Sequence, residues 1–410
     1  MTTQKSISQT SIGPNQIEFN PLKFLAALGA GGISVMPFAF FQYTHHTGKG
    51  LISFAKMGHG TLPMWQEGLF YTLEGVMILF ALMHFWLTIR FLRGLVPWMK
   101  TGSYRDFIND PIRNAGILAP FISIGMTFNV FIGPIRFFVP AMAENLQVLM
   151  LPALVSWAIL WVALLRMETK LLSISFAQSF DVSKINFGWL LHPFALGMIS
   201  VTGTGIAAMG KDPSIAHIAA FMSLVTGSMG LFLLTVKTVA IFKSHFSAEG
   251  LPAKQFLPSL LIVIPNITLY AIGGFRLTHY MDHQFGAHLH WLGQVIVVAA
   301  FAFEVWYMLF GLSMLKNYFK NHFFNSEFHV SQWGLICPFV AFAVLGAFFY
   351  KNFVPNPVSY AVILLAMLTS VVAYIMLFKK SAICAAITRK VKGHDCSDSL
   401  IPKPAQSSSI

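Results

Sequence analysis

Long apolar segments alternate with short polar connections along the chain. Ten segments are apolar over roughly 20 residues or more, the length that an α-helix needs to cross about 30 Å of hydrocarbon. They lie near residues 22–43, 67–94, 112–136, 146–166, 187–209, 215–243, 256–276, 288–316, 331–350 and 357–379. Because lipid cannot pair with an exposed backbone, this pattern predicts an all-α polytopic membrane protein with ten transmembrane helices.

Polar segments flank the apolar region. Residues 1–20 are rich in Ser, Thr and Gln, and we expect them to form a disordered cytoplasmic N-terminus. Residues 21–380 are expected to form the transmembrane domain, and residues 381–410 a cytoplasmic tail with a Pro- and Ser-rich end.

The basic residues predict the orientation of the spans. Six of the 27 Lys and Arg residues lie on or beside the segments that follow odd-numbered spans, and the other 21 lie on the opposite side. Cytoplasmic loops are enriched in Lys and Arg, so we expect both termini in the cytoplasm. With 56% apolar and 10% charged residues, the net charge of +12 reflects topology and contact with anionic lipid, and binding to nucleic acid is excluded.

An internal repeat marks the odd-numbered spans. Pro120, Pro193, Pro265 and Pro338 are separated by 73, 72 and 73 residues, and a fixed period indicates a repeated unit, here one helical hairpin. A proline inside a helix removes a backbone hydrogen bond that lipid cannot replace. The repeat therefore predicts five hairpins, with kinked odd-numbered helices in an inner ring around a conduit and even-numbered helices facing lipid.

The first span differs from the other odd-numbered spans. Its Pro37 lies 83 residues before Pro120 and late in the apolar segment. We expect the run that contains Gly29, Gly31 and Gly32 to supply the equivalent break.

Several short motifs resemble the tellurite-resistance/dicarboxylate transporter family, which includes slow anion channels, malate permeases and sulfite efflux pumps. They are Phe24-Leu-Ala-Ala-Leu-Gly-Ala-Gly-Gly32, Pro111-Ile-Arg113 ahead of Pro120, Met209-Gly-Lys-Asp212 after Pro193, Pro265, and Trp333 five residues ahead of Pro338. The resemblance covers roughly residues 20–380. It implies a channel or permease for small anions, with a pore in each protomer of a homo-oligomer. It further implies a trimer in the plasma membrane, the inner membrane of a bacterium.

The inner-ring prediction and the resemblance together assign a set of pore-lining positions. They are Gly29, Gly31, Gly32, Pro120, Phe121, Asn129, Pro193, Phe194, Pro265, Asn266, Cys337, Pro338 and Phe339. In the family, a phenylalanine in the ninth span plugs the pore just before the helix break. Cys337 occupies that position here, so Phe339, Phe121 or Phe194 closes the pore, or the conduit is wider. Because no Lys or Arg lies mid-span on an odd-numbered helix, selectivity is expected from helix dipoles, hydroxyl groups and the basic residues Arg136 and Arg276 at the outer mouth.

Two carboxylic acids fall inside predicted spans, Glu74 in the second and Glu304 in the eighth. An ionised acid at the centre of a membrane costs about 2.5–3.5 kcal/mol on insertion scales, so each is either neutral or paired. Either acid could couple a proton to anion transport, or bond to a neighbouring helix. Their place on even-numbered helices favours the structural role.

The histidines leave a second function open. Seven of them map to the outer face: His45, His46, His59, His279, His283, His288 and His290. They could ligate zinc or copper or respond to pH, but without a cysteine or acidic cluster we predict no metal site and no cofactor. A quinone- or haem-binding subunit of a respiratory oxidoreductase is the alternative, although only His84 and His192 lie deep in spans. No nucleotide-binding or hydrolytic motif occurs, so we do not expect an enzyme.

Overall fold

The computed structural model describes residues 19–178, 185–247, 252–325 and 328–390. Within these residues the chain forms helices and no β-strand, and ten helices are long and apolar enough to cross a membrane. The predicted all-α polytopic fold is therefore confirmed. Most of both predicted polar ends, residues 1–18 and 391–410, lies outside the described residues.

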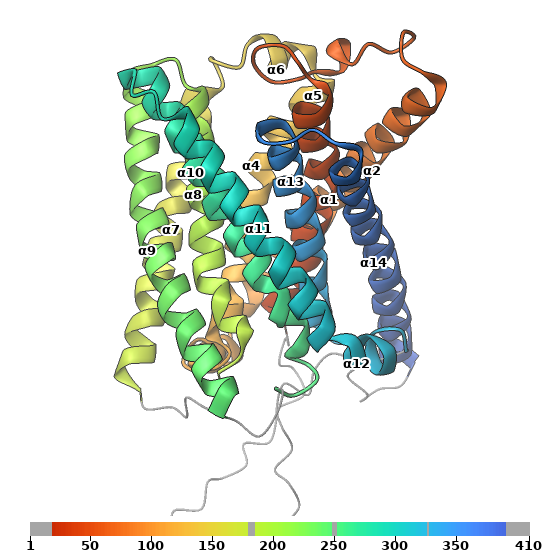
Figure 1. Ribbon diagram of the computed structural model, residues 1–410. Helices are drawn as coiled ribbons and strands as arrows, with labels where there is room; N and C mark the ends of the chain where they lie inside the picture. Colours follow the sequence, from red (N-terminus) through yellow and green to blue (C-terminus); the bar gives the residue numbers. More distant parts are fainter. Residues whose placement is uncertain (1–18, 179–184, 248–251, 326–327, 391–410) are drawn as a thin grey trace, which may run out of the picture.

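Five helices occupy the middle of the bundle and correspond to the odd-numbered spans (Figure 1). These inner helices are α1 (Phe24–Phe40), α4 (Ala119–Val130), α8 (Leu191–Met209), α10 (Val263–Phe285) and α13 (Ile336–Asn352). The outer helices are α2 (Met64–Trp98), α7 (Met150–Ala177), α9 (Pro213–Ser247), α11 (His290–Met314) and α14 (Pro357–Lys390). The short connecting helices are α3 (Gly102–Ile108), α5 (Arg136–Phe138), α6 (Pro140–Glu144) and α12 (Lys316–Tyr318).

Large apolar side chains are exposed mainly on the outer helices. Ile159 of α7, Phe221 of α9 and Leu309 of α11 are each more than 60% exposed, whereas no large apolar side chain described on α1, α4, α8 or α13 is exposed. Because such a surface is stable only against hydrocarbon, the outer helices face lipid and the inner helices are enclosed.

Each inner helix begins with a 3-10 turn on the side of the bundle that carries the chain ends. These turns are Pro21–Lys23, Asn114–Leu118, Phe187–Leu190, Leu257–Ile262 and Val330–Leu335. The periodic prolines follow at once, within the first three residues of α4, α8, α10 and α13. A first-turn N–H has no partner in its own helix, so a proline there starts the helix without breaking it. The prediction of kinked helices is corrected: the repeat is a repeated helix start.

Pro193, Pro265 and Pro338 are each the third residue of their helix. The third residue of α1 is Ala26, which lies ahead of the glycine run. A Cβ on Gly31 would lie 2.6 Å from Cγ of Met126, and one on Gly32 would lie 2.9 Å from Cγ1 of Val340. These glycines therefore allow α1 to pack closely against its neighbours, and they do not break the helix.

Side chains of the outer helices satisfy backbone carbonyls at these helix starts. The Tyr374 hydroxyl of α14 donates to the carbonyl of Ala26 at 3.1 Å. The Tyr307 hydroxyl of α11 donates to the carbonyl of Leu260 at 3.1 Å. Such bonds join the outer ring to the inner ring at the level of the helix starts.

Candidate functional site

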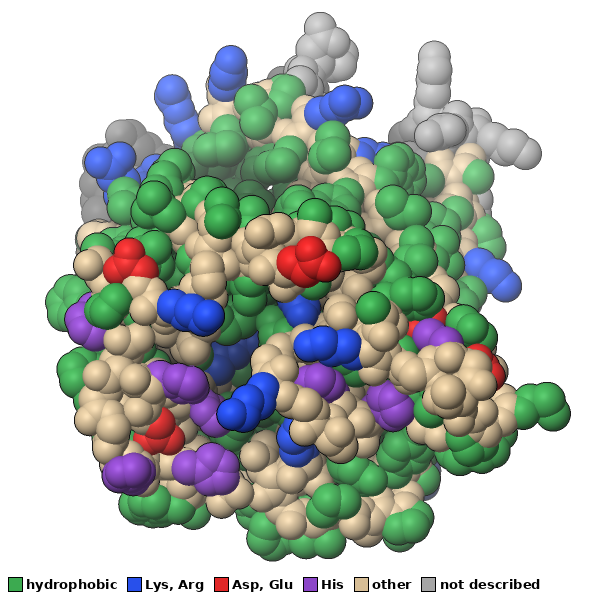
Figure 2. Space-filling model, turned by 90° about the horizontal axis from the view of Figure 1, so that it is seen from above, with side chains coloured by type: hydrophobic (Ala, Val, Ile, Leu, Met, Phe, Trp, Pro, Cys, Tyr) green, Lys and Arg blue, Asp and Glu red, His purple; other side chains and the backbone are tan. Residues whose placement is uncertain are grey.

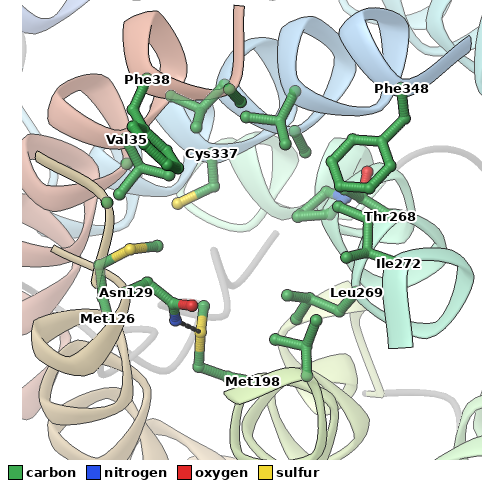
Figure 3. Close-up of a pocket in the computed structure, with 18 of the residues that line it drawn as sticks. Val35, Phe38, Met126, Asn129, Met198, Thr268, Leu269, Ile272, Cys337 and Phe348 are labelled. Carbon is green, nitrogen blue, oxygen red and sulfur yellow. Dashed lines mark hydrogen bonds between the residues drawn. The ribbon is translucent and has the colours of Figure 1, made fainter. Parts of the chain in front are cut away.

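A cavity of about 150 Å³ lies among the five inner helices. We call it the upper cavity, since it lies on the side away from the chain ends. Its wall includes Val35 of α1, Asn129 of α4, Met198 of α8, Thr268 of α10 and Phe348 of α13, and Figure 3 shows these side chains around one space. The inner helices therefore enclose an open volume on the axis of the bundle.

A second cavity, of about 90 Å³, lies below the first. We call it the lower cavity. Every 3-10 turn that starts an inner helix contributes to its wall, through Leu22, Gly116, Gly188, Ile262 and Gly334. The repeated helix starts thus surround the lower end of the axis.

Two residues separate these cavities. Phe194 and Cys337 line both of them, and no other described residue does. Phe194 follows Pro193 in the first turn of α8, and Cys337 precedes Pro338 in the first turn of α13. These two side chains are 3% and 8% exposed, so both are buried at the level between the cavities.

Arg276 is the single charged residue in the wall of the upper cavity, among the residues described. Its Nη1 donates to the carbonyl of Val201 at 2.7 Å. The remaining polar residues of this wall are uncharged and most of its surface is apolar. Since the described wall holds no carboxylate, the upper cavity has a net positive charge.

In the lower cavity the positive potential comes from helix ends, because the one arginine of its described wall is paired with an acid. Arg113 is the one charged residue in its described wall, and Nε of Arg113 lies 2.6 Å from Oδ2 of Asp110. The N-termini of all five inner helices lie at this level, because the odd-numbered spans run in one direction. Each helix N-terminus carries the equivalent of about half a positive charge.

The two arginines predicted at the outer mouth have different positions. Arg276 lies on the cavity wall, whereas the guanidinium of Arg136 is 2% exposed and donates to the carbonyls of Leu51 and Ile52 at 3.0–3.1 Å. Leu51 itself lines the upper cavity. Arg136 therefore holds the loop after α1 across the mouth and contributes no charge to the wall.

Lys351 fixes a second point of this loop. Its Nζ donates to the carbonyl of His46 at 2.9 Å. Burial of the imidazole, followed by the charges of Lys351 and Lys56, holds the pKa of His46 below its ordinary value. Figure 2 shows Lys, Arg and His side chains gathered near the middle of this upper face, so an approaching anion meets a basic surface.

The predicted pore-lining residues divide into two groups. The upper cavity is lined by Gly29, Gly32, Asn129, Phe194, Pro265 and Cys337. Neither axial cavity is lined by Gly31, Pro120, Phe121, Pro193, Asn266, Pro338 or Phe339. The second group consists mostly of helix-start residues, whose side chains pack between helices. Of the three candidate gates, Phe194 alone lies on the axis, while Phe121 and Phe339 are half-buried against the core.

The two predicted acids have different surroundings. Oε1 of Glu74 lies 2.8 Å from Nε2 of His59, which pairs this acid with the outer loop. Glu304 is fully buried, with its Oε1 2.5 Å from Oγ1 of Thr268. Because Thr268 lines the upper cavity, Glu304 lies one hydrogen bond away from it.

The hydrogen bonds around Thr268 suit a protonated Glu304. Oγ1 of Thr268 also lies 3.2 Å from the carbonyl of Ile264, and a hydroxyl has one proton to donate. If Glu304 donates to Thr268, the threonine proton is free for Ile264 and both contacts are satisfied. Oε2 of Glu304 has no hydrogen-bond partner among the described residues, and this is far less costly for a neutral acid than for a carboxylate.

The two histidines that lie deep in the spans, His84 and His192, form hydrogen bonds within the protein. Nδ1 of His84 lies 2.8 Å from the carbonyl of Ala27, and Nε2 lies 2.9 Å from Oγ1 of Thr127. Nδ1 of His192 lies 2.6 Å from Oε2 of Glu168. Both nitrogens of His84 are used, so this residue has none left for haem iron.

Sequence reasoning missed a cluster of buried ionisable residues beside His192. Glu168 is fully buried between α7 and α8, and Nζ of Lys237 lies 4.5 Å from the ring centre of Trp189. The predicted fourth span ends at residue 166, but α7 continues to Ala177 and carries Glu168 into the bundle. The lysine within the predicted sixth span was the available signal, because a charge at that depth requires a partner.

Two of the outer histidines, His279 and His290, lie near each other. In the parts of the chain that the structure describes, no three His, Cys, Asp or Glu side chains come close enough together to hold an ion. The rings of His279 and His290 are 6.1 Å apart. The nearby carboxylate of Asp282 accepts the backbone N–H of Leu289 at 2.5 Å.

Comparison with known proteins agrees with this geometry. A family model described as SLAC1, voltage-dependent anion channel, matches residues 18–379. The match covers all five inner helices and both axial cavities. No curated protein matches the chain.

Proposed function

Since the chain belongs to the voltage-dependent anion channel family, the tellurite-resistance/dicarboxylate transporters that its motifs resemble, we propose that small anions cross the membrane along the axis of each chain. The route runs through the lower cavity, past Phe194 and Cys337, and through the upper cavity. Halides, inorganic oxyanions and C4-dicarboxylates are the proposed substrates.

One observation carries this proposal. The two cavities are each lined by all five inner-helix units, and the residues common to both walls are Phe194 and Cys337. A conduit within one chain needs this arrangement: enclosed space on both sides of a short barrier. A hydrophobic constriction of this kind closes a pore by excluding water.

The charge distribution supports anions over cations. The described wall of the upper cavity holds Arg276 and no carboxylate. Five helix N-termini surround the lower cavity, where Arg113 is paired with Asp110. Partial charges of helix ends attract an anion without binding it tightly, so it can also leave.

We also propose that Glu304 is the proton-coupling acid. Its hydrogen bond to Thr268 gives it access to the upper cavity, and its surroundings accept a neutral acid. Glu74, by contrast, is paired with His59 away from both cavities. Transport of an anion together with a proton is consistent with this position.

We propose the orientation and the assembly from sequence features. The excess of Lys and Arg on one side supports cytoplasmic termini in a plasma membrane. The family resemblance supports a homotrimer. Since both cavities lie within a single chain, each subunit of such a trimer would hold its own pore.

Replacing the barrier side chain tests the proposed function. Phe194→Ala is expected to raise anion flux about tenfold, which corresponds to a barrier lowered by about 1.4 kcal/mol. Flux is measured in proteoliposomes with chloride, nitrate, sulfite and malate in turn, which also identifies the substrate. Phe121→Ala and Phe339→Ala are matched controls, because neither ring lines a cavity.

Equal effects of all three substitutions would contradict a gate at Phe194. Transport of cations in place of anions by the Phe194→Ala variant would contradict the proposed substrate class.

A further inference from the structure

A third cavity, of about 740 Å³, lies at the side of the bundle among α2, α14 and the start of α1. It shares no lining residue with the two axial cavities. We call it the lateral cavity. Its volume is in the range of ligand sites, and its wall extends from Lys23 at the start of α1 to Cys384 near the end of α14.

The lateral cavity lies at the edge of the hydrocarbon layer. On α2, Trp86 and Ile89 are 51% exposed and apolar, and the next residue is the exposed Arg90. On α14, the exposed side chains from Ala361 to Phe378 are apolar, Lys379 is the first exposed basic residue, and exposed apolar residues such as Ile383 follow it. On each outer helix the first exposed basic residue, Arg90 or Lys379, follows a long exposed apolar stretch, and basic residues in such places are typical of the level of lipid headgroups.

Two cations face this cavity. Lys23 and Arg90 are the charged residues of its described wall, and neither has a carboxylate within 4.0 Å in the described parts of the chain. The guanidinium carbon of Arg90 lies 5.2 Å from the ring centre of Trp86. A pair of cations without a described acidic partner favours an anionic ligand.

Six of the fourteen other residues of the described wall are aromatic. The ring of Phe91 packs on Phe24 at 5.6 Å, and the ring of Trp333 packs on Tyr374 at 5.0 Å. These contacts fix the apolar surface in place. It is suited to a hydrocarbon chain and offers nothing to a free inorganic anion.

We propose that the lateral cavity binds an anionic phospholipid of the leaflet next to the chain ends. The phosphate lies between Lys23 and Arg90, and an acyl chain lies along the aromatic wall. Because Lys23 belongs to the 3-10 turn before α1 and Trp333 to the one before α13, the lipid contacts two of the helix starts that surround the lower cavity.

Binding is tested on the full-length protein, purified in a neutral detergent and freed of lipid. Phosphatidylglycerol is titrated while thermal unfolding is recorded, with phosphatidylcholine and inorganic phosphate in parallel, and retained lipid is counted by mass spectrometry. The double variant K23Q/R90Q removes both cations of the cavity. The matched control R93Q/K379Q removes the same charge from the same level, because Arg93 and Lys379 are exposed and do not line the cavity.

Phosphatidylglycerol is expected to raise the Tm of the wild type and of the control. For K23Q/R90Q we expect an affinity roughly 25-fold lower, since each basic residue near a membrane surface contributes about fivefold. R90K keeps the charge and should retain most of the affinity, which separates loss of the site from misfolding.

Three results would overturn the proposal. They are an equal shift with phosphatidylcholine, the same shift with inorganic phosphate alone, and equal losses in the double variant and in its control. A change in oligomeric state confined to K23Q/R90Q would instead assign the cavity to a second copy of the chain, and would also overturn it.

Discussion

At the scale of single residues, Arg276 is the side chain that we expect to act most directly on a permeating anion. It is the one charged side chain in the described wall of the upper cavity, where the remaining surface is mostly apolar. A fixed cation in a region of low dielectric attracts anions more strongly than a cation in water. We therefore propose that anion selectivity in the upper cavity depends on this residue.

Arg276→Gln is expected to lower anion flux about tenfold, because removal of the charge raises the barrier for an anion by about 1.4 kcal/mol. Arg276→Lys keeps the charge and should keep most of the flux. Lys211→Gln is the matched control: it removes an exposed charge from the same side, away from the cavity. Flux into proteoliposomes measures all three, and a loss in Lys211→Gln as large as in Arg276→Gln would show that only overall surface charge matters.

Glu304→Gln tests proton coupling. The amide has the shape of the acid and can donate to Thr268 as the protonated acid does, so the fold should be preserved. We expect uptake to lose its dependence on a pH gradient. Glu74→Gln is the control, since that acid is paired with His59 outside the pathway. If the dependence persists in Glu304→Gln, then Glu304 has a structural role.

At the scale of helices, the period of about 73 residues identified the correct repeat but not its physical meaning. A proline in a long apolar segment predicts a kink when the segment is taken as one helix. In the structure the segment begins with a 3-10 turn, and Pro193 and Pro265 are the third residues of α8 and α10. The sequence does not separate these cases, because both consist of the same apolar residues.

The glycines of α1 contribute to stability because they let neighbouring helices pack closely against it. Gly31→Ala places a methyl group 2.6 Å from Met126 and 2.8 Å from Nδ1 of His84. Overpacking of this kind costs about 1–3 kcal/mol, so we expect a lower Tm in detergent. Gly75→Ala on α2 is the control, because a Cβ there has no neighbour within 4 Å. A Tm for Gly31→Ala equal to that of the wild type would contradict the close packing of α1 on α2 and α4.

At the scale of the whole molecule, hydropathy and the internal repeat together were sufficient to predict the fold. Ten apolar segments predicted ten membrane-spanning helices, and the alternation of enclosed and lipid-facing helices followed from the repeat. The pathway was less predictable. Three phenylalanines at equivalent places in the repeat were equal candidates for the gate, and only the packing of the helix starts turns Phe194 toward the axis.

Buried partners across helices were also beyond the sequence. Glu304 reaches the cavity through Thr268 on another helix, and Glu168 pairs with His192 from a part of α7 that hydropathy placed outside the membrane. Such pairs depend on the rotation of each helix about its own axis. A single sequence determines that rotation only coarsely, through the apolar face of the helix.

Chemical modification of Cys337 tests the central claim most directly, that anions pass along the axis of a single chain. In a Cys384→Ser/Cys396→Ser background, Cys337 is the one remaining thiol of three, and Phe194→Ala opens the approach to it. An anionic methanethiosulfonate then attaches a bulky charged group at the constriction. We expect anion flux to fall at least about tenfold, and a further Cys337→Ser substitution to abolish this sensitivity. Unchanged flux after complete modification, verified by mass spectrometry, would place the anion pathway elsewhere.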